Sequence, residues 1–259
     1  MLISKLRTII RILRTIRNWP VYFMDYSGFT KSKYITYSLR NGVKYRVRSK
    51  TLDRVIINEI WIHKFYTPCG FKIKDNSTIL DIGAQIGVFS IFASKYNSSG
   101  IVYSFEPAKE NFRMLENNIK LNNNQNIVPI NKAVSNKTGR IDFFINDGEN
   151  LGGHSTIPSE KGNKVIVESI SLEDFVKKYK IKKIDFLKMD CEGGEYDILF
   201  KCPDNILKMI EKMSIEYHDI DNNNNGISLK KFLEKKGFNV RIQADEKGKL
   251  GMLYIIRIA

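Results

Sequence analysis

The sequence predicts an α/β domain with a mostly parallel sheet and an antiparallel last strand. Three segments carry this prediction, at residues 79–92, 101–122 and 184–199. Each begins as a short apolar run, as buried strands do, passes through a polar or glycine-containing turn and resumes with helical spacing. Strands that alternate with helices form parallel sheets, and the ligands of such sheets bind where the strands end.

The first eighteen residues predict a basic amphipathic helix, which ends at Trp19-Pro20. Its apolar stripe consists of Leu2, Leu6, Ile9, Leu13 and Ile16, and its basic residues are Lys5, Arg7, Arg11, Arg14 and Arg17. The apolar residues are interrupted too often for a transmembrane span or a signal-peptide core. The helix therefore packs on its own domain or on a second subunit, or it lies on an anionic membrane surface near lipid-linked substrates.

Residues 34–66 predict a hairpin and a helix that covers one edge of the sheet. Strand-like alternation flanks Asn41-Gly42, a strong hairpin signal, over residues 34–40 and 44–48. Asp53 then caps a helix that runs towards residue 66. We place the boundary between an N-terminal extension, residues 1–52, and the main domain, residues 53–259, at this cap. His63 has no partner in the sequence, and we interpret it as structural.

The turn in residues 79–92, ILDIGAQIGVFSIF, is suited to a small polar ligand. Gly83 and Gly87 let the backbone turn tightly, and the next helix begins with unpaired N–H groups that face the ligand. The turn has no Gly-Lys-Ser/Thr, and its spacing does not match the three-glycine dinucleotide fingerprint. Neither kind of phosphate-binding loop therefore fits well.

Carboxylates at the ends of the first two strands indicate what the ligand carries. The second strand, IVYSFEP at residues 101–107, places Glu106 at its end, where the carboxylate is suited to accept hydrogen bonds from both hydroxyls of a ribose. Asp81 adds negative charge, which suits a ligand with a ribose and a positive centre. S-adenosylmethionine has both features. A ligand-free turn in an ordinary α/β protein stays the alternative.

The middle of the chain predicts a helix at residues 108–122 and a third strand at residues 127–130. Two more strand-like segments, residues 139–146 and 164–169, flank a long polar, glycine-rich stretch. Loops of this length inside compact domains are usually functional or disordered. His154 at its centre either faces a substrate or is a solvated loop residue. Ser171 and Asp174 then open a helix.

The third segment, IDFLKMDCEGGEYDIL at residues 184–199, completes a pattern. With DIGAQIG, SFEP and DCEGGE in this order, the chain resembles the FkbM-type family of S-adenosylmethionine-dependent methyltransferases. The likeness covers roughly residues 53 to 218. It implies a class I methyltransferase, or Rossmann-like, sheet. Gln85 stands where the family usually has Asn, a change that keeps the amide.

The resemblance implies a cofactor site for S-adenosylmethionine at the strand ends. In the resembling fold the loop after the third strand lies against adenine, which brings in Ala133. The expected cofactor-binding residues are Asp81, Gly83, Ala84, Gln85, Gly87, Glu106, Pro107, Ala133 and Asp190. Glu59 and Tyr66 are weaker candidates, and both could be surface or packing residues instead.

The resemblance also implies where the substrate binds. Residues 212–217 predict a strand that carries Glu216 and His218 to its end, and a helix at residues 227–236 and two antiparallel strands at residues 238–242 and 252–258 close the domain. The expected substrate contacts are His154, Glu192, Glu195, Glu216 and His218.

A base near the acceptor oxygen would speed its methylation. We expect Asp190 on the cofactor side and as a candidate base, with Glu192 and His218 orienting the hydroxyl or taking its proton. Carboxylates can also hold a divalent ion, but nothing in the sequence completes a coordination set, so we expect no metal.

Composition sets wider bounds. The chain has 259 residues, enough for one α/β domain with a small extension. Its three cysteines, Cys69, Cys191 and Cys202, follow no metal or disulfide spacing, which indicates a reducing compartment. We expect a cytoplasmic protein, and the N-terminal helix leaves peripheral contact at the inner face of the membrane open as an alternative to packing within the protein. The net charge of +14 raises nucleic acid and anionic lipid as partners, or it reflects the lysine-rich composition of an AT-biased genome.

The resemblance implies O-methylation of a hydroxyl on a small molecule or sugar, with S-adenosylhomocysteine as product. We expect a role in surface glycan or nucleotide-sugar biosynthesis. A nucleic-acid methyltransferase is the first rival, but DCEGGE stands where amino-methylating enzymes carry an Asn/Asp-Pro-Pro-aromatic clamp. The second rival is a non-catalytic cofactor-fold subunit of a glycan-assembly complex. The sequence leaves the oligomeric state open.

Overall fold

The protein is built on a seven-stranded sheet with strand order β11-β12-β10-β9-β3-β4-β5. The computed structural model describes residues 2–146, 154, 162–245 and 248–258. The strands are β3 (Thr78–Ile82), β4 (Ile101–Phe105), β5 (Ile127–Ile130), β9 (Phe186–Met189), β10 (Lys212–His218), β11 (Phe238–Ala244) and β12 (Leu250–Arg257). Strands β10, β9, β3, β4 and β5 are parallel, and β12 runs antiparallel to β10 and β11. The predicted fold class is confirmed.

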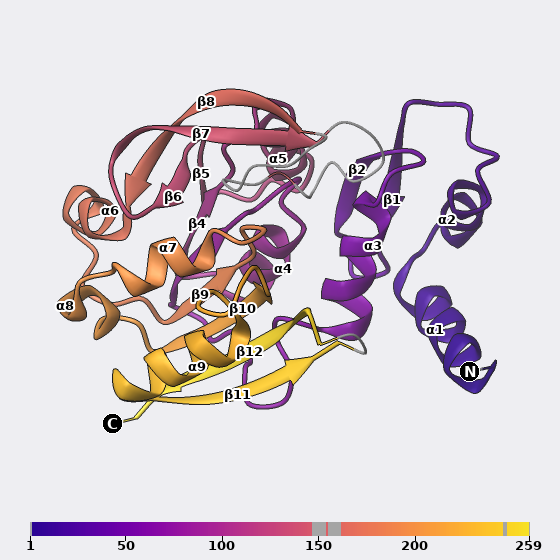
Figure 1. The fold of residues 1–259 in the computed structure, drawn as a ribbon. Helices are drawn as coiled ribbons and strands as arrows, with labels where there is room; N and C mark the ends of the chain where they lie inside the picture. The colour runs from indigo at the N-terminus through magenta and orange to yellow at the C-terminus, as the bar shows by residue number, and fades with distance from the viewer. Residues whose placement is uncertain (1, 147–153, 155–161, 246–247, 259) are drawn as a thin grey trace.

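Helices cover both faces of this sheet (Figure 1). They are α4 (Val88–Tyr96), α5 (Lys109–Leu121), α6 (Leu172–Tyr179), α7 (Glu195–Phe200), α8 (Asp204–Leu207) and α9 (Gly226–Lys235). Successive residues of a strand point to opposite faces. Ile79 accordingly packs with the side chains of α4 and α5, whereas Leu80 packs with those of α6 to α9. Two apolar cores therefore hold the strand ends in place.

A smaller sheet with strand order β6-β8-β7 lies beyond the end of β5. It consists of β6 (Ala133–Ser135), β7 (Gly139–Asn146) and β8 (Gly162–Ser171). The predicted strand over residues 139–146 is confirmed, and the second one extends further at both ends. Ala133 lies in a strand rather than in a loop, because it pairs in parallel with Ser169. The Ser171 side chain caps α6 by accepting from the backbone N–H of Asp174 at 3.1 Å.

The N-terminal part forms α1 (Leu2–Thr15), α2 (Trp19–Tyr26), β1 (Tyr34–Ser38) and β2 (Lys44–Arg48). The first helix ends at Thr15, before Trp19-Pro20 as predicted, but a second helix that was not predicted begins at Trp19. Pro20 lies in the first turn of α2, where proline is tolerated because its missing N–H is not needed. The predicted hairpin is confirmed, with Ile35 opposite Val47. None of the described helices is long and apolar enough to span a membrane.

This part shares a core with the main domain. Ile16, which directly follows α1, and Tyr45 of β2 are fully buried in the same cluster as Phe89 of α4. A buried ion pair also crosses the predicted boundary at residue 52, since Arg48 Nη2 lies 2.8 Å from Oδ1 of Asp53. The extension therefore packs as an integral layer beside α4 and α5.

The helix after Asp53 changes its winding where it reaches the site. It begins as α3 (Asp53–Ile57) and continues as the π-helix η1 (Asn58–His63), which ends at Lys64 in a left-handed conformation. Insertions of π-helix are uncommon and often occur at functional sites. Glu59 and Ile60 of η1 line the pocket described next.

Candidate active site

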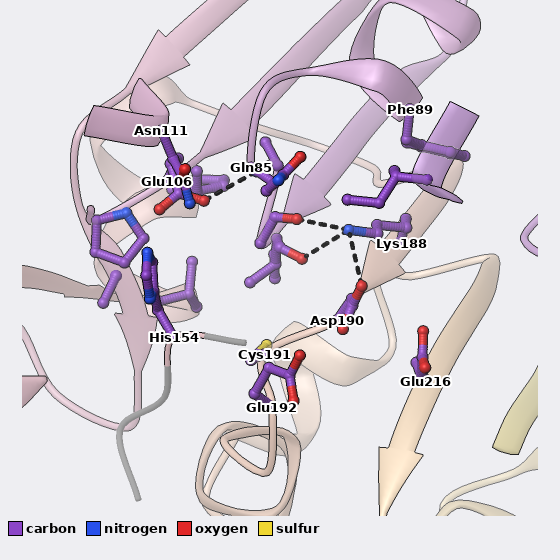
Figure 2. A pocket seen from close by; sticks show the side chains of 18 of the residues that line it. Gln85, Phe89, Glu106, Asn111, His154, Lys188, Asp190, Cys191, Glu192 and Glu216 are labelled. Carbon is purple, nitrogen blue, oxygen red and sulfur yellow. Dashed lines mark hydrogen bonds and ion pairs between the residues drawn. The ribbon is translucent and has the colours of Figure 1, made fainter. Parts of the chain in front are cut away.

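A pocket opens at the carboxyl ends of β3, β4 and β9, with η1 and β6 as its side walls. Its apolar lining includes Ile60, Phe89, Phe105, Val134 and Phe143. Figure 2 shows two groups of polar residues in it. Glu106, Asn111 and His154 lie at one end, and Asp190, Glu192 and Glu216 lie at the other. We call these the Glu106 end and the Asp190 end.

The turn after β3 lies directly against the end of β9. Gly83 has a φ of +77°, and a Cβ at this position would lie 1.8 Å from the carbonyl oxygen of Asp190. Gln85 follows with a φ of 51°, which is uncommon outside glycine. Its side-chain Nε2 donates to Oδ1 of Asp53 at 2.8 Å, so the amide ties the turn to α3. Only glycine fits at position 83.

Glu106 is fixed by backbone amides at the Glu106 end. Its Oε2 accepts from the N–H of Gln85 at 2.9 Å and its Oε1 accepts from the N–H of Ala108 at 2.8 Å. Burial raises the pKa of Glu106 to about 7. Both oxygens keep further acceptor capacity, which suits a ribose diol. Pro107, Ala133 and other apolar residues lie in the same pocket, and such residues suit a flat nucleobase.

Asp81 and Gly87 do not line the pocket, although both are predicted to contact the cofactor. Asp81 is wholly buried, and its Oδ2 accepts from Oγ of Ser90 at 2.6 Å. A Cβ at Gly87 would lie 2.5 Å from Cδ1 of Leu115 in α5. The structure places both residues behind the turn, where Asp81 supports Lys188 and Gly87 lets α5 approach.

Lys188 lies between the turn after β3 and Asp190, and it was not among the residues predicted from the sequence. Its Nζ donates to the carbonyl oxygen of Gly83 at 2.7 Å and lies 3.2 Å from Asp81 Oδ1 and 3.9 Å from Asp190 Oδ2. Burial alone would lower the pKa of Lys188, but Asp81 and Asp190 outweigh it and raise the pKa. The lysine is therefore charged. A lysine inside the buried strand FLKM was the available signal.

Tyr66 bridges two carboxyl groups at the Asp190 end. Its hydroxyl lies 2.9 Å from Oδ2 of Asp190 and 2.8 Å from Oε2 of Glu216. One hydroxyl proton satisfies only one of these bonds, so the second needs a proton on a carboxyl group. Burial and the neighbouring Asp190 raise the pKa of Glu216 to about 8 and that of Glu59 to about 7. Glu216 therefore carries the second proton at neutral pH.

His218 lies between two glutamates. Its Nδ1 is 2.9 Å from Oε1 of Glu195, and its Nε2 is 3.3 Å from Oε2 of Glu192. Burial alone would lower the pKa of His218, but the bond to Glu195 and the charge of Glu192 raise the pKa to about 9. The imidazole is therefore protonated at neutral pH and does not act as a base in this state.

Glu195 holds His218 from behind. It is wholly buried, accepts from the backbone N–H of Gly193 at 2.8 Å, and does not line the pocket. The geometry therefore favours a positioning role for Glu195 in place of the predicted substrate contact. Glu192 lines the pocket with a φ of 51°, and burial raises its pKa to about 7.

The remaining predicted residues fall into two groups. His154 is buried in the pocket lining, with its ring edge-on to Phe143 at 6.3 Å. The predicted residues that line the pocket are Gly83, Ala84, Gln85, Glu106, Pro107, Ala133, His154, Asp190, Glu192 and Glu216. Those that lie behind its lining are Asp81, Gly87, Glu195 and His218.

Three of these residues offer ligand atoms within 4.8 Å of one another: Asp190, Glu192 and His218. A cation there would compete with the proton that His218 shares between its two glutamates. Within the described parts of the chain, these three residues form the sole cluster of this kind.

Several known proteins are similar to this chain over part of its length. A 31-O-demethyl-FK506 methyltransferase FkbM of Streptomyces tacrolimicus is 24% identical over 215 residues, 72% of this chain and 82% of that protein. A hexuronic acid methyltransferase AglP of Haloferax volcanii is 23% identical over 148 residues, 57% of this chain and 58% of that protein. The crystal structure of M. jannaschii TYW2 in complex with AdoMet is 17% identical to this chain in sequence, with a TM-score of 0.49. The similarity covers 88% of this chain and 89% of the TYW2 chain.

The family model of the methyltransferase FkbM domain matches residues 81–240, which span the turn after β3, Glu106, the whole of β9 and His218. This match covers more than half of the chain and contains both ends of the pocket. The chain therefore belongs to the FkbM methyltransferase family and is an S-adenosylmethionine-dependent methyltransferase.

Proposed function

We propose that the enzyme methylates a hydroxyl oxygen of a neutral, hydroxyl-rich acceptor such as a sugar. The observation that carries this proposal is the division of the pocket into an end with a backbone-held carboxyl group at Glu106 and a carboxyl-rich end at Asp190 (Figure 2). An alcohol oxygen needs help to lose its proton, and carboxyl groups supply such help.

The Glu106 end fits the adenosine part of S-adenosylmethionine. Glu106 would hold the ribose hydroxyls, because its carboxylate is already oriented by the N–H groups of Gln85 and Ala108. Ala133 and Val134 would lie beside the adenine. When bound, S-adenosylmethionine supplies an electrophilic methyl group and leaves as S-adenosylhomocysteine. The chain itself contributes mainly position, since it holds acceptor and donor in one pocket.

We assign Glu192 as the base. A base works best when its pKa lies near the working pH, and the pKa of Glu192 is about 7. His218 stabilises the ionised carboxylate from 3.3 Å, and Glu195 fixes the ring of His218. Glu192 then takes the proton of the acceptor hydroxyl as the oxygen gains its methyl group. Asp190 is engaged by Tyr66, which leaves it on the cofactor side.

The lining also restricts the acceptor. Asp190 and the ionised form of Glu192 would repel a carboxylate on the reacting part of the acceptor. They accept hydrogen bonds from hydroxyl groups, which a sugar provides. The names of the two relatives, one with an O-demethyl substrate and one with a hexuronic acid, support oxygen and sugar as the classes. We therefore propose a neutral sugar unit, within surface glycan or nucleotide-sugar biosynthesis.

The net charge of +14 supports a nucleic acid as a second candidate acceptor. The carboxyl groups around the reacting end oppose it, because phosphates close to them would be repelled. Methyl transfer to RNA that falls steeply with salt would support this candidate over a sugar.

Calorimetric titration of S-adenosylhomocysteine tests the cofactor end. We expect Glu106→Ala to weaken binding by roughly a hundredfold, since a hydrogen-bonded charged group contributes about 1.5–3 kcal/mol. The control is Glu234→Ala, the same substitution at an exposed position of α9, and it should leave binding unchanged. Equal binding by both variants would contradict the assignment of Glu106.

Labelled S-adenosylmethionine then tests the acceptor. We expect transfer of the labelled methyl group to nucleotide sugars whose sugar unit is uncharged, or to neutral glycans, in an ether linkage that resists hydrolysis. Transfer to hexuronic acids alone would contradict the proposed restriction. Cofactor binding with no transfer to sugars, small hydroxylated molecules or RNA would favour the non-catalytic subunit.

A further inference from the structure

The N-terminal part exposes an unusual amount of apolar surface. Of seventeen large apolar side chains that are exposed among the described residues, seven lie between residues 6 and 29. They are Leu6, Ile9, Ile10, Trp19, Met24, Tyr26 and Phe29, and we call them the N-terminal apolar patch. Phe29 is 76% exposed and Tyr26 is 66% exposed. Scattered exposed apolar residues are normal, but such a concentration marks an interaction surface.

The domain covers only one side of the apolar stripe of α1. Ile12 is buried in the core, whereas Leu6 and Ile10 of the same helix remain exposed. Figure 1 shows α1 and α2 together at the edge of the molecule, away from the seven-stranded sheet. The sequence left open whether this helix packs on its own domain. Such packing accounts for only part of its apolar stripe.

The charge beside this patch has one sign. Residues 1–24 contain five basic residues and no acidic one. The arginines at positions 7, 11, 14 and 17 are all exposed. The first acidic residue, Asp25, is buried and accepts from the hydroxyl of Tyr37 at 2.6 Å. Among the described side chains of α1, the charged ones are therefore all basic.

We propose that the N-terminal apolar patch and the arginines of α1 dock the enzyme on an anionic lipid bilayer. Apolar side chains enter the boundary between headgroups and acyl chains, and arginines pair with lipid phosphates. A second copy of the chain fits this surface poorly, because a symmetric interface would bring the arginines of both copies together without an acid to pair them.

The docking surface adjoins the pocket through one element. Helix α1 packs against η1, and η1 lines the pocket with Glu59 and Ile60. Docking would thus bring the pocket close to an acceptor carried at a lipid surface. This last step rests on the proposed function, whereas docking itself does not.

Sedimentation with vesicles tests the docking. We expect the full-length protein to bind vesicles of phosphatidylcholine with 30% phosphatidylglycerol, and to bind pure phosphatidylcholine vesicles at least about tenfold more weakly. The triple variant Arg7→Gln/Arg11→Gln/Arg14→Gln should lose roughly tenfold or more of the binding to anionic vesicles. Leu6→Ser/Ile10→Ser should lose a similar amount without a change of charge.

The matched control is Lys208→Gln/Lys231→Gln/Lys235→Gln, which removes the same charge from exposed positions near the sheet edge. An equal loss in this control would show adsorption by overall charge and overturn the proposal. Equal binding to both vesicle types would overturn it as well.

Two further measurements separate the remaining outcomes. A concentration-dependent dimer of the wild type that Leu6→Ser/Ile10→Ser dissociates would identify a second copy as the occupant and overturn lipid docking. Each variant should bind S-adenosylhomocysteine as the wild type does, which shows that it is folded. Failure of vesicle binding with intact cofactor binding would thus reject the docking and leave the methyltransferase assignment untouched.

Discussion

The two ends of the pocket hold their carboxyl groups by different means. At the Glu106 end, backbone N–H groups of Gln85 and Ala108 fix both oxygens of one carboxylate. At the Asp190 end, side chains fix one another, as with Tyr66 between Asp190 and Glu216. Backbone donors stay in place under substitution, whereas a side-chain network shares protons and can be retuned. The Glu106 end is thus rigid, and the Asp190 end is titratable.

The largest expected effect concerns Lys188, which joins the two ends. Lys188→Met leaves Asp81 buried without its cation and removes the bond to Gly83, so we expect the free energy of unfolding to fall by about 3–5 kcal/mol. Urea denaturation measures this change. The control Lys201→Met breaks an exposed pair with Asp197 and should cost no more than about 1 kcal/mol. Similar losses in the two variants would show that the buried contacts of Lys188 do not stabilise the fold more than an exposed ion pair does.

The next effect separates the ends by function. Glu192→Gln keeps size and shape but removes the base, so we expect kcat to fall by about a hundredfold or more. Affinity for S-adenosylhomocysteine should change less than about twofold, because Glu192 lies at the opposite end from Glu106. Single-turnover kinetics and calorimetry give the two values. Near-normal turnover would move the base to another residue, with Asp190 next in line.

The same contrast explains what could be predicted from the sequence. Gln85 and Glu106 are 21 residues apart and follow the successive strands β3 and β4, so a local motif brings them together. Tyr66 is 124 residues from Asp190 and 150 residues from Glu216. Contacts of this range depend on how η1 packs across the sheet, which no local pattern specifies. Glu59 and Tyr66 accordingly received only weak predictions.

The fold follows the same rule. Apolar runs and turn signals located the strands of the main sheet to within a few residues, because burial on both faces leaves a strong pattern. The parallel pairing of β6 with β8 joins Ala133 to Ser169 and was missed, since no local pattern marks it. Asp81 was expected at the ligand because it ends a strand. Asp81 is instead buried beside Lys188 of β9, whose Nζ lies 3.2 Å from its Oδ1, and no local pattern shows this pairing.

A third test uses pH. Glu192 must be ionised to act as base, and its pKa is raised to about 7, so kcat/KM should rise with pH through about 7. His218 must stay protonated to support it, and its pKa is raised to about 9, so activity should fall above about 9. Affinity for S-adenosylhomocysteine should not follow the alkaline limb. In Glu195→Gln the alkaline limb should move to lower pH, because His218 loses the partner that most raises its pKa.

The smallest expected effect tests the shared proton. If Glu216 is protonated at neutral pH, Glu216→Gln replaces a neutral acid by a neutral amide, and S-adenosylhomocysteine affinity at pH 6 should stay within about twofold of wild type. Above pH 8 the wild-type carboxyl ionises, and the two proteins should diverge. Asp190→Asn is the matched control and should differ from wild type already at pH 6, since Asp190 accepts the Tyr66 proton and faces Lys188. A loss of affinity in Glu216→Gln at pH 6 as large as that in Asp190→Asn would mean that Glu216 is already ionised there and that Tyr66 bridges two charged carboxylates.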